Sequence, residues 1–432
     1  MHILVELGRR KMNRSIGKFF KNEYFISIIT KAFSIILGFI QSVLMARYLG
    51  AELKGVNTYI SSITAVSAII ITFGMHQAYP FFRKKYSKEV IYDDYISLVI
   101  LVYLFYFFIA SIISILGYFS FSIVTIIFLT PIAGYSQTIA YIVLIENPNK
   151  RNGYWTLICL LDVIYVACLW FYTQRNMMWG ISILFFSDII KGVVFTALLK
   201  FKFRIHSKQL KLLGEILKFG FFPMLALLMT SLNYRIDVIM LHEYDYITDA
   251  MIGVYSLGLS LSDKIFLIPD TLKGVLVSKL AKGADEHEVA KVSRLGFWIA
   301  VLISGFLIVF GKWIIDFMYG AEYRDAYSVI VITAIGTISI VYFKMIGQYN
   351  IIKGKQYLNV IMLSIAIVVD VVFNLIMIPR WGILGAAVAT TIGNISCCVV
   401  FIVYFCVLTK INVGEMFFIQ KSDINWLKQL KK

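Results

Sequence analysis

Long apolar segments of about twenty residues recur along this chain, and they constrain its fold more than any other feature. Each is long enough to cross a bilayer as an α-helix. A helix is expected because lipid offers the backbone no hydrogen-bond partner, and barrel strands would be shorter and would alternate in hydropathy. The twelve predicted spans cover residues 24–46, 56–82, 95–117, 120–145, 154–172, 178–199, 219–241, 250–277, 295–318, 326–350, 357–378 and 383–408.

The composition agrees with an integral, all-α membrane protein. Of the 432 residues, 59% are hydrophobic and 15% are charged, whereas a soluble domain is about 25% charged. The connections between spans are short and contain no G-x-x-x-x-G-K-[ST] nucleotide motif. The five cysteines lie in apolar segments without a His at metal-ligand spacing. We therefore expect no cofactor and no metal.

Lys and Arg are distributed unevenly between the two sides of the predicted spans. One side carries 29 of the 41 and the other carries 5, with the remaining 7 inside spans. This asymmetry predicts that both termini are cytoplasmic. It also accounts for the net charge of +16 without a nucleic-acid partner. The basic N-terminal segment lacks a compact apolar core, so we expect no cleaved signal peptide, and Met12 is an alternative start.

The chain reads as two halves of six spans each. The predicted domains are residues 1–205 and 206–432, divided in a basic loop. Gly55 and Gly253 occupy corresponding positions after the first span of each half, and each is followed by Val. Because six spans return the chain to the same side, the halves form a parallel repeat with its pseudo-axis along the membrane normal. Transporters built this way place their substrate at the interface of the halves.

Charged residues within the predicted spans are the strongest functional signal, because a charge in a bilayer is costly and marks a site by default. Arg235 and Asp237 are two residues apart and point about 200° away from each other on a helix. Asp263 and Lys264 are adjacent in the next span. Each needs a partner on another helix or water in a cavity. Two interpretations stay open: a polar network that joins two helices, or a site at which Arg235 and Lys264 hold an anion.

Three further intramembrane bases have simpler explanations. Asp188 with Lys191, and Asp270 with Lys273, are spaced three apart and are expected to pair within their helices. Lys344 lies near the inner end of its span, so we expect its side chain to extend to the membrane surface.

Two charges have no opposite charge within a helical turn. Lys31 either extends to the surface or faces a water-filled cavity. Asp370 has only Asn374 one turn away. A lone carboxylate in a span is either a proton carrier or a protonated group bonded to a neighbouring helix, and both interpretations stay open.

Four segments carry a resemblance to a known family. They are VLMARYLGAELKGVNTYI (43–60), LNYRIDVIML (232–241), IGVYSLGLSLSDKIFLIP (252–269) and PRWGILGAAVATTIGN (379–394). On these segments and the twelve-span layout, the chain resembles the Wzx-type polysaccharide (lipid-linked oligosaccharide) flippases. Their superfamily also contains multidrug extruders and lipid II flippases. One departure is VLVSKLAKG (275–283), where such proteins often carry a proline.

The resemblance implies two six-helix bundles in a V shape around a central cavity. It implies a flippase that moves an undecaprenyl-diphosphate-linked oligosaccharide across the bacterial cytoplasmic membrane by alternating access. On that basis Lys31, Arg235 and Lys264 are expected to bind the diphosphate, and Tyr234 and Tyr255 to stack on sugars.

The same resemblance implies a role for the intramembrane carboxylates. Asp237, Asp263 and Asp370 are expected to form a polar network or to couple transport to H⁺ or Na⁺. Membrane lipids and glycan-assembly proteins are the other expected partners.

Three alternatives remain. A multidrug extruder of the same superfamily would need a net acidic site for its cationic substrates. A glycan polymerase or ligase would need a sizeable outer loop, which the chain lacks, so we expect no enzyme. The third is a scaffold in a glycan-assembly complex.

Overall fold

Nearly all of the described chain is α-helical. The computed structural model describes residues 23–420, apart from 87, 206–207, 282 and 284. The basic N-terminal segment with Met12, and the last residues of the chain, lie outside the described part. The all-α fold predicted from hydropathy is confirmed: ten helical segments within the described residues are long and apolar enough to cross a membrane. Two of the ten are more than fifty residues long.

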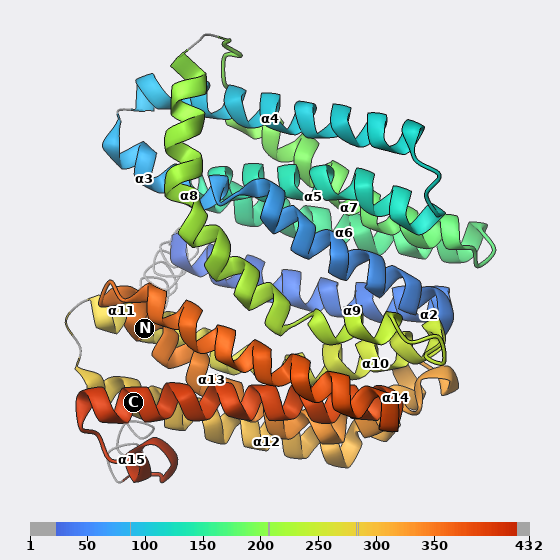
Figure 1. Cartoon of the computed structure of the whole chain (residues 1–432), viewed down its shortest axis with the longest axis vertical. Coiled ribbons are helices and arrows are strands. Elements are labelled where there is room, and N and C mark those ends of the chain that lie inside the picture. Colours follow the sequence, from blue (N-terminus) through green and yellow to red (C-terminus); the bar gives the residue numbers. More distant parts are fainter. Residues whose placement is uncertain (1–22, 87, 206–207, 282, 284, 421–432) are drawn as a thin grey trace, which may run out of the picture. The chain divides into compact units, whose positions relative to one another are not determined.

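The described residues form two compact units. The first comprises those in Met1–Leu49 and Ser67–Pro223, and the second those in Gly50–Val66 and Met224–Lys432. The predicted division at 205/206 stays a prediction about the repeat. The helices that contribute to the first unit are α2 (Glu23–Thr72), α3 (Met75–Lys85), α4 (Lys88–Leu116), α5 (Phe121–Glu146), α6 (Pro148–Tyr172), α7 (Met177–Leu199) and α8 (Lys208–Asn233) (Figure 1).

The second unit contains the remaining helices. In chain order these are α9 (Ile236–His242), α10 (Asp249–Ser262), the 3₁₀ turn η1 (Asp263–Phe266), α11 (Leu267–Ala281), α12 (Glu286–Met318), η2 (Ala321–Tyr323), α13 (Ala326–Ile352), α14 (Gln356–Thr409) and α15 (Val413–Phe417). In Figure 1, α12, α13 and α14 run side by side, and α13 packs against both of the others.

Two glycines divide the longest helices, so ten helical segments account for about twelve spans. At 1.5 Å per residue, α14 would be about 80 Å long, whereas the hydrocarbon core is about 30 Å thick. Gly382 has φ 56° and ψ −133°, and there the helix turns back on itself. A Cβ added at Gly393 would lie only 2.8 Å from the Cβ of Asp370 on the first half.

The first long helix breaks in the same way. Gly50 in α2 has φ 71° and ψ 177°, a conformation that favours glycine. The chain between the predicted spans 24–46 and 56–82 is therefore not a loop. It is helical on both sides of Gly50, where the two helices meet. A second break at Phe73 and Gly74, both with positive φ, separates α3 from α2.

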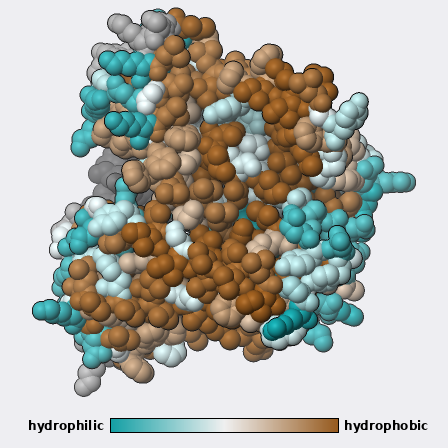
Figure 2. All heavy atoms as spheres, in the orientation of Figure 1, coloured by the Kyte–Doolittle hydropathy of each residue, from teal (hydrophilic) through white to brown (hydrophobic). Residues whose placement is uncertain are grey.

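Apolar side chains cover much of the visible face of each unit, and hydrophilic ones gather toward its left and right edges (Figure 2). Large apolar side chains such as Leu104, Phe108 and Val309 are more than half exposed. A membrane-spanning protein is expected to have such an exposed apolar belt between two polar ends.

The tightest helix crossing in the second unit joins two corresponding glycines. A Cβ added at Gly55 would overlap the carbonyl oxygen of Asp249, and one added at Gly253 would overlap that of Ala51. One turn further on, the Thr58 hydroxyl donates to Ser256 Oγ at 3.1 Å. Small residues permit this approach of two backbones, as in other membrane helix pairs.

Replacement of Gly253 by Ala is expected to destabilise the protein by about 1–3 kcal/mol, because the new methyl group meets backbone that cannot move aside. Gly305→Ala is the matched control, since a Cβ there meets nothing within 4 Å. The thermal midpoint of the purified protein in detergent should fall for the first variant and stay the same or rise slightly for the second. Equal midpoints would contradict the importance of the crossing.

Candidate functional site

Two of the predicted spans are interrupted at the residues singled out for their charge. The predicted span 219–241 is broken, because α8 ends at Asn233 and α9 begins at Ile236. Arg235 lies in the break with φ −139° and ψ −12°. The predicted span 250–277 is also broken, because the turn η1 separates α10 from α11 and begins at Asp263. The predicted spans 219–241 and 250–277 therefore each contain a break in the helix.

The breaks leave backbone groups without helical partners, which short-range bonds only partly replace. The amides of Tyr234 and Arg235 donate to carbonyl oxygens three residues back, at 3.2 and 3.1 Å. Irregular backbone at membrane depth is tolerated where it is buried in protein or lines a wet cavity. In transporters, such discontinuous helices mark the binding site.

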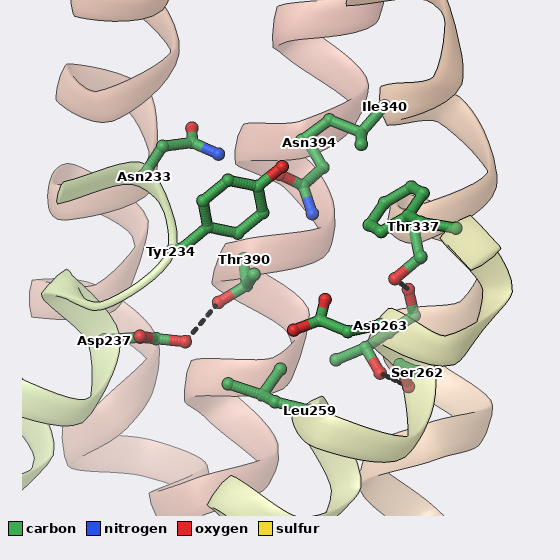
Figure 3. A pocket seen from close by; sticks show the side chains of 12 residues that line it. Asn233, Tyr234, Asp237, Leu259, Ser262, Asp263, Thr337, Ile340, Thr390 and Asn394 are labelled. Atoms are coloured by element: carbon green, nitrogen blue, oxygen red, sulfur yellow. Dashed lines mark hydrogen bonds between the residues drawn. The ribbon is translucent and has the colours of Figure 1, made fainter. Parts of the chain in front are cut away.

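The two breaks and the helices α13 and α14 enclose a small polar cavity in the second unit (Figure 3). Its volume is about 60 Å³, which is room for an ion or a few water molecules and too small for a sugar. Nine of its twelve lining residues carry a polar group: Asn233, Tyr234, Asp237, Ser262, Asp263, Thr333, Thr337, Thr390 and Asn394.

Asp237 is the most completely bonded carboxylate at the cavity. Its side chain is buried and accepts hydrogen bonds from the Tyr255 hydroxyl, from Thr390 Oγ1 at 3.2 Å and from the Val238 amide at 2.8 Å. Tyr255 itself is fully buried. In this arrangement its ring is not exposed to a sugar, and its hydroxyl serves Asp237 instead.

Asp370 is a second buried carboxylate near the first. Asn374 Nδ2 donates to it at 3.1 Å, and Gly393 on the returning half of α14 packs against it. Asp370 lies close enough to Asp237 and Tyr255 to interact electrostatically with both. Among the described residues, no basic side chain forms an ion pair with Asp237 or Asp370. Two like charges this close disfavour each other, so a proton or a bound cation would stabilise the pair.

The predicted cations do not neutralise these carboxylates by direct contact. Arg235 and Lys264 are both partly buried, and neither makes a side-chain hydrogen bond or ion pair within the described part of the chain. In particular, no ion pair joins Arg235 to Asp263 or Lys264 to Asp237 among the described residues. Arg235 and Lys264 instead act on the exposed Asp263 from a greater distance.

The remaining predicted ligands differ in position. Tyr234 lines the cavity and is 36% exposed, so its ring is accessible. Lys31 is exposed and belongs to the first unit.

The two helical ion pairs expected from spacing are present. Lys191 lies 3.3 Å from Asp188, and Lys273 lies 3.2 Å from Asp270. The expectation that Lys344 extends to the membrane surface is wrong. Its ammonium group bonds both oxygens of Asp270, each at 3.2 Å.

Sequence reasoning missed the short polar side chains of the cavity. Thr390 and Asn394 lie in an apolar segment in which a single hydroxyl or amide carries no signal by itself. Their four-residue spacing, on one face of a helix, is the pattern that could have indicated a polar stripe.

Comparison with known proteins identifies relatives of this chain. Over 179 residues the chain is 26% identical to "Capsular polysaccharide biosynthesis protein CapF" of Staphylococcus aureus. Over 114 residues it is 29% identical to "Uncharacterized membrane protein MJ1068" of Methanocaldococcus jannaschii. These matches cover 38% and 26% of this chain, and only 43% and 22% of the two relatives.

Solved structures of transporters share the fold over almost the whole chain. The inward closed conformation of the lipid II flippase MurJ aligns with a TM-score of 0.70 and 17% identity, covering 94% of this chain and 92% of that one. An inward-facing multidrug resistance MATE family transporter of the MOP superfamily aligns with a TM-score of 0.65 and 13% identity, covering 89% and 98%.

The family itself comes from a sequence profile described as "Polysaccharide biosynthesis protein", which matches residues 20–265, more than half of the chain. It agrees with the family that the four sequence segments indicate. The chain therefore belongs to the polysaccharide biosynthesis protein family, with the fold of the MurJ and MATE transporters.

Proposed function

We propose that this protein is a flippase that moves undecaprenyl-diphosphate-linked oligosaccharide units across the bacterial cytoplasmic membrane during assembly of a surface polysaccharide. The observation that carries the proposal is the pair of helix breaks with two unpaired cations, Arg235 and Lys264. The charge count of the loops supports a cytoplasmic position for both termini. Transport then proceeds by alternating access of the site to the two sides of the membrane.

An anionic ligand explains why these cations form no ion pair with any of the described residues. An unpaired charge at membrane depth is costly, so it marks the pathway of a ligand that completes it. Arg grips phosphate oxygens bidentately, while Lys acts as a compact point charge, and a diphosphate suits both. A multidrug extruder, whose cationic substrate Asp237, Asp263 and Asp370 would attract and Arg235 and Lys264 would repel, is the second candidate.

The buried carboxylates are candidates for binding the ion that drives transport. Asp237 and Asp370 lie near each other. The Thr390 hydroxyl donates a hydrogen bond to Asp237, and the Asn374 amide donates one to Asp370. The adjoining cavity of about 60 Å³ has room for an ion. Binding of H⁺ or Na⁺ here would relieve the repulsion between the two carboxylates and so couple the ion gradient to the conformation of α9, α10 and α14.

Arg235→Ala is expected to reduce export of the glycan at least about tenfold, because a charge-assisted contact to phosphate is worth more than about 1.4 kcal/mol. Cells carrying the variant should lack the surface glycan and accumulate lipid-linked units inside. The control is Arg324→Ala, whose exposed side chain pairs with Asp316 at 2.8 Å. Normal surface display at normal expression of Arg235→Ala would remove this residue from the site.

Asp370→Asn is expected to uncouple transport from the ion gradient while preserving the shape of the side chain. The measurement is uptake of a labelled lipid-linked oligosaccharide into vesicles with and without an imposed proton or sodium gradient. The wild-type rate should respond to one of the gradients and the rate of the variant to neither. Asp316→Asn, at the end of α12, should retain the response. A variant at Asp370 that keeps its full response would exclude this carboxylate as the coupling group.

A further inference from the structure

One carboxylate in the second unit is shared by two lysines. Asp270 and Lys273 lie one turn apart on α11, and Lys344 reaches Asp270 from α13. Lys344 Nζ lies 3.2 Å from each Asp270 oxygen, and Lys273 Nζ lies 3.2 Å from Oδ1. Charge-assisted bonds of this kind are usually about 2.7–2.9 Å long. The contacts of Asp270 are therefore long, and a single negative charge serves two positive ones.

The surroundings of Lys344 explain why it needs a partner in the resting state. Its side chain is only 14% exposed, and its ammonium group lies 3.8 Å from the centroid of the Phe266 ring. An ammonium group so far out of water is stable only beside a negative charge or an aromatic face. The other two members are more open, with side chains 39% and 35% exposed for Asp270 and Lys273. A ligand can therefore approach the group from the Asp270 side.

The group adjoins the break in the eighth span. Phe266, which supports Lys344, also lines the polar cavity. Lys344 acts electrostatically on Asp263, as do Lys264 and Arg235. Four cations, Arg235, Lys264, Lys273 and Lys344, thus share three carboxylates, Asp237, Asp263 and Asp270, which leaves one positive charge in excess when all three are ionised. A diphosphate group would balance that excess.

We propose that Lys344 binds the diphosphate group of the substrate. In the substrate-free state, the Asp270 carboxylate takes the place of the diphosphate beside Lys344. On binding, the diphosphate displaces the Asp270 carboxylate from Lys344, and Lys273 keeps that carboxylate neutralised on its own helix. This inference rests on the proposed function and adds a third cation to Arg235 and Lys264.

The positions of the two lysines explain why Lys273 keeps Asp270 as its partner and Lys344 exchanges it. Lys273 shares a helix with Asp270, so their contact survives any movement of α11 relative to α13. Lys344 is held only across helices, so exchanging its partner breaks no contact within α11. A diphosphate offers more oxygens and more charge than one carboxylate, which favours the exchange.

Binding of undecaprenyl diphosphate to the purified full chain in detergent tests the proposal. Lys344→Gln should weaken binding about tenfold, the loss expected for one charge-assisted contact. Asp270→Asn should strengthen binding several-fold, because it removes the competitor. The double variant should bind as weakly as Lys344→Gln. Undecaprenol, which lacks the phosphates, should bind all four proteins equally.

A purely structural ion pair gives the opposite pattern. Asp270→Asn would then leave the largely buried Lys344 unpaired and lower both the thermal midpoint and binding, and the double variant, which leaves only the more open Lys273 without its partner, would restore both. Such rescue in the double variant, or weaker binding by Asp270→Asn, would overturn the proposal while the proposed function stands. If the wild-type protein does not bind undecaprenyl diphosphate above undecaprenol, the proposed function fails first. Arg324→Gln, which breaks an exposed pair outside the group, should bind like the wild type.

Discussion

The structure depends on one constraint: in a bilayer every backbone amide and carbonyl must find its partner within the protein. Helices satisfy that requirement everywhere along a span except at a break. This chain breaks two neighbouring spans, at Tyr234–Arg235 and at Asp263–Phe266, and surrounds both breaks with polar side chains from α13 and α14. The polar cavity and the positions of Arg235 and Lys264 follow from that departure from regular helix.

Hydropathy predicts most of the fold because long apolar segments have one solution in lipid. It does not predict where a span is interrupted, since averaging over about nineteen residues removes a break of two to four residues. Gly50 and Gly382 were visible as glycines, but only their positive φ shows that each replaces a loop. The predicted spans end and begin on either side of these two residues, at 46 and 56 and at 378 and 383, and their number was about right.

The candidate site was predictable to the extent that its members are rare in membrane spans. Asp237 and Asp370 stand out as carboxylates in apolar sequence, and the structure brings them near each other. Thr390 does not stand out, because a threonine in a span can satisfy its own helix. The partner of Lys344 could not be predicted at all: Asp270 lies 74 residues away, and helical spacing gives information over only four.

The repeat in the sequence has a physical counterpart in the crossing of Gly55 and Gly253. Each glycine lacks the Cβ that would overlap the other helix's backbone, so the requirement is reciprocal. Thr58 and Ser256, each three residues further on, meet by a hydrogen bond, so corresponding positions 198 residues apart contact each other twice. A crossing between two equivalent segments imposes the same small side chains on both. This requirement accounts for the glycine at both positions that the predicted repeat pairs.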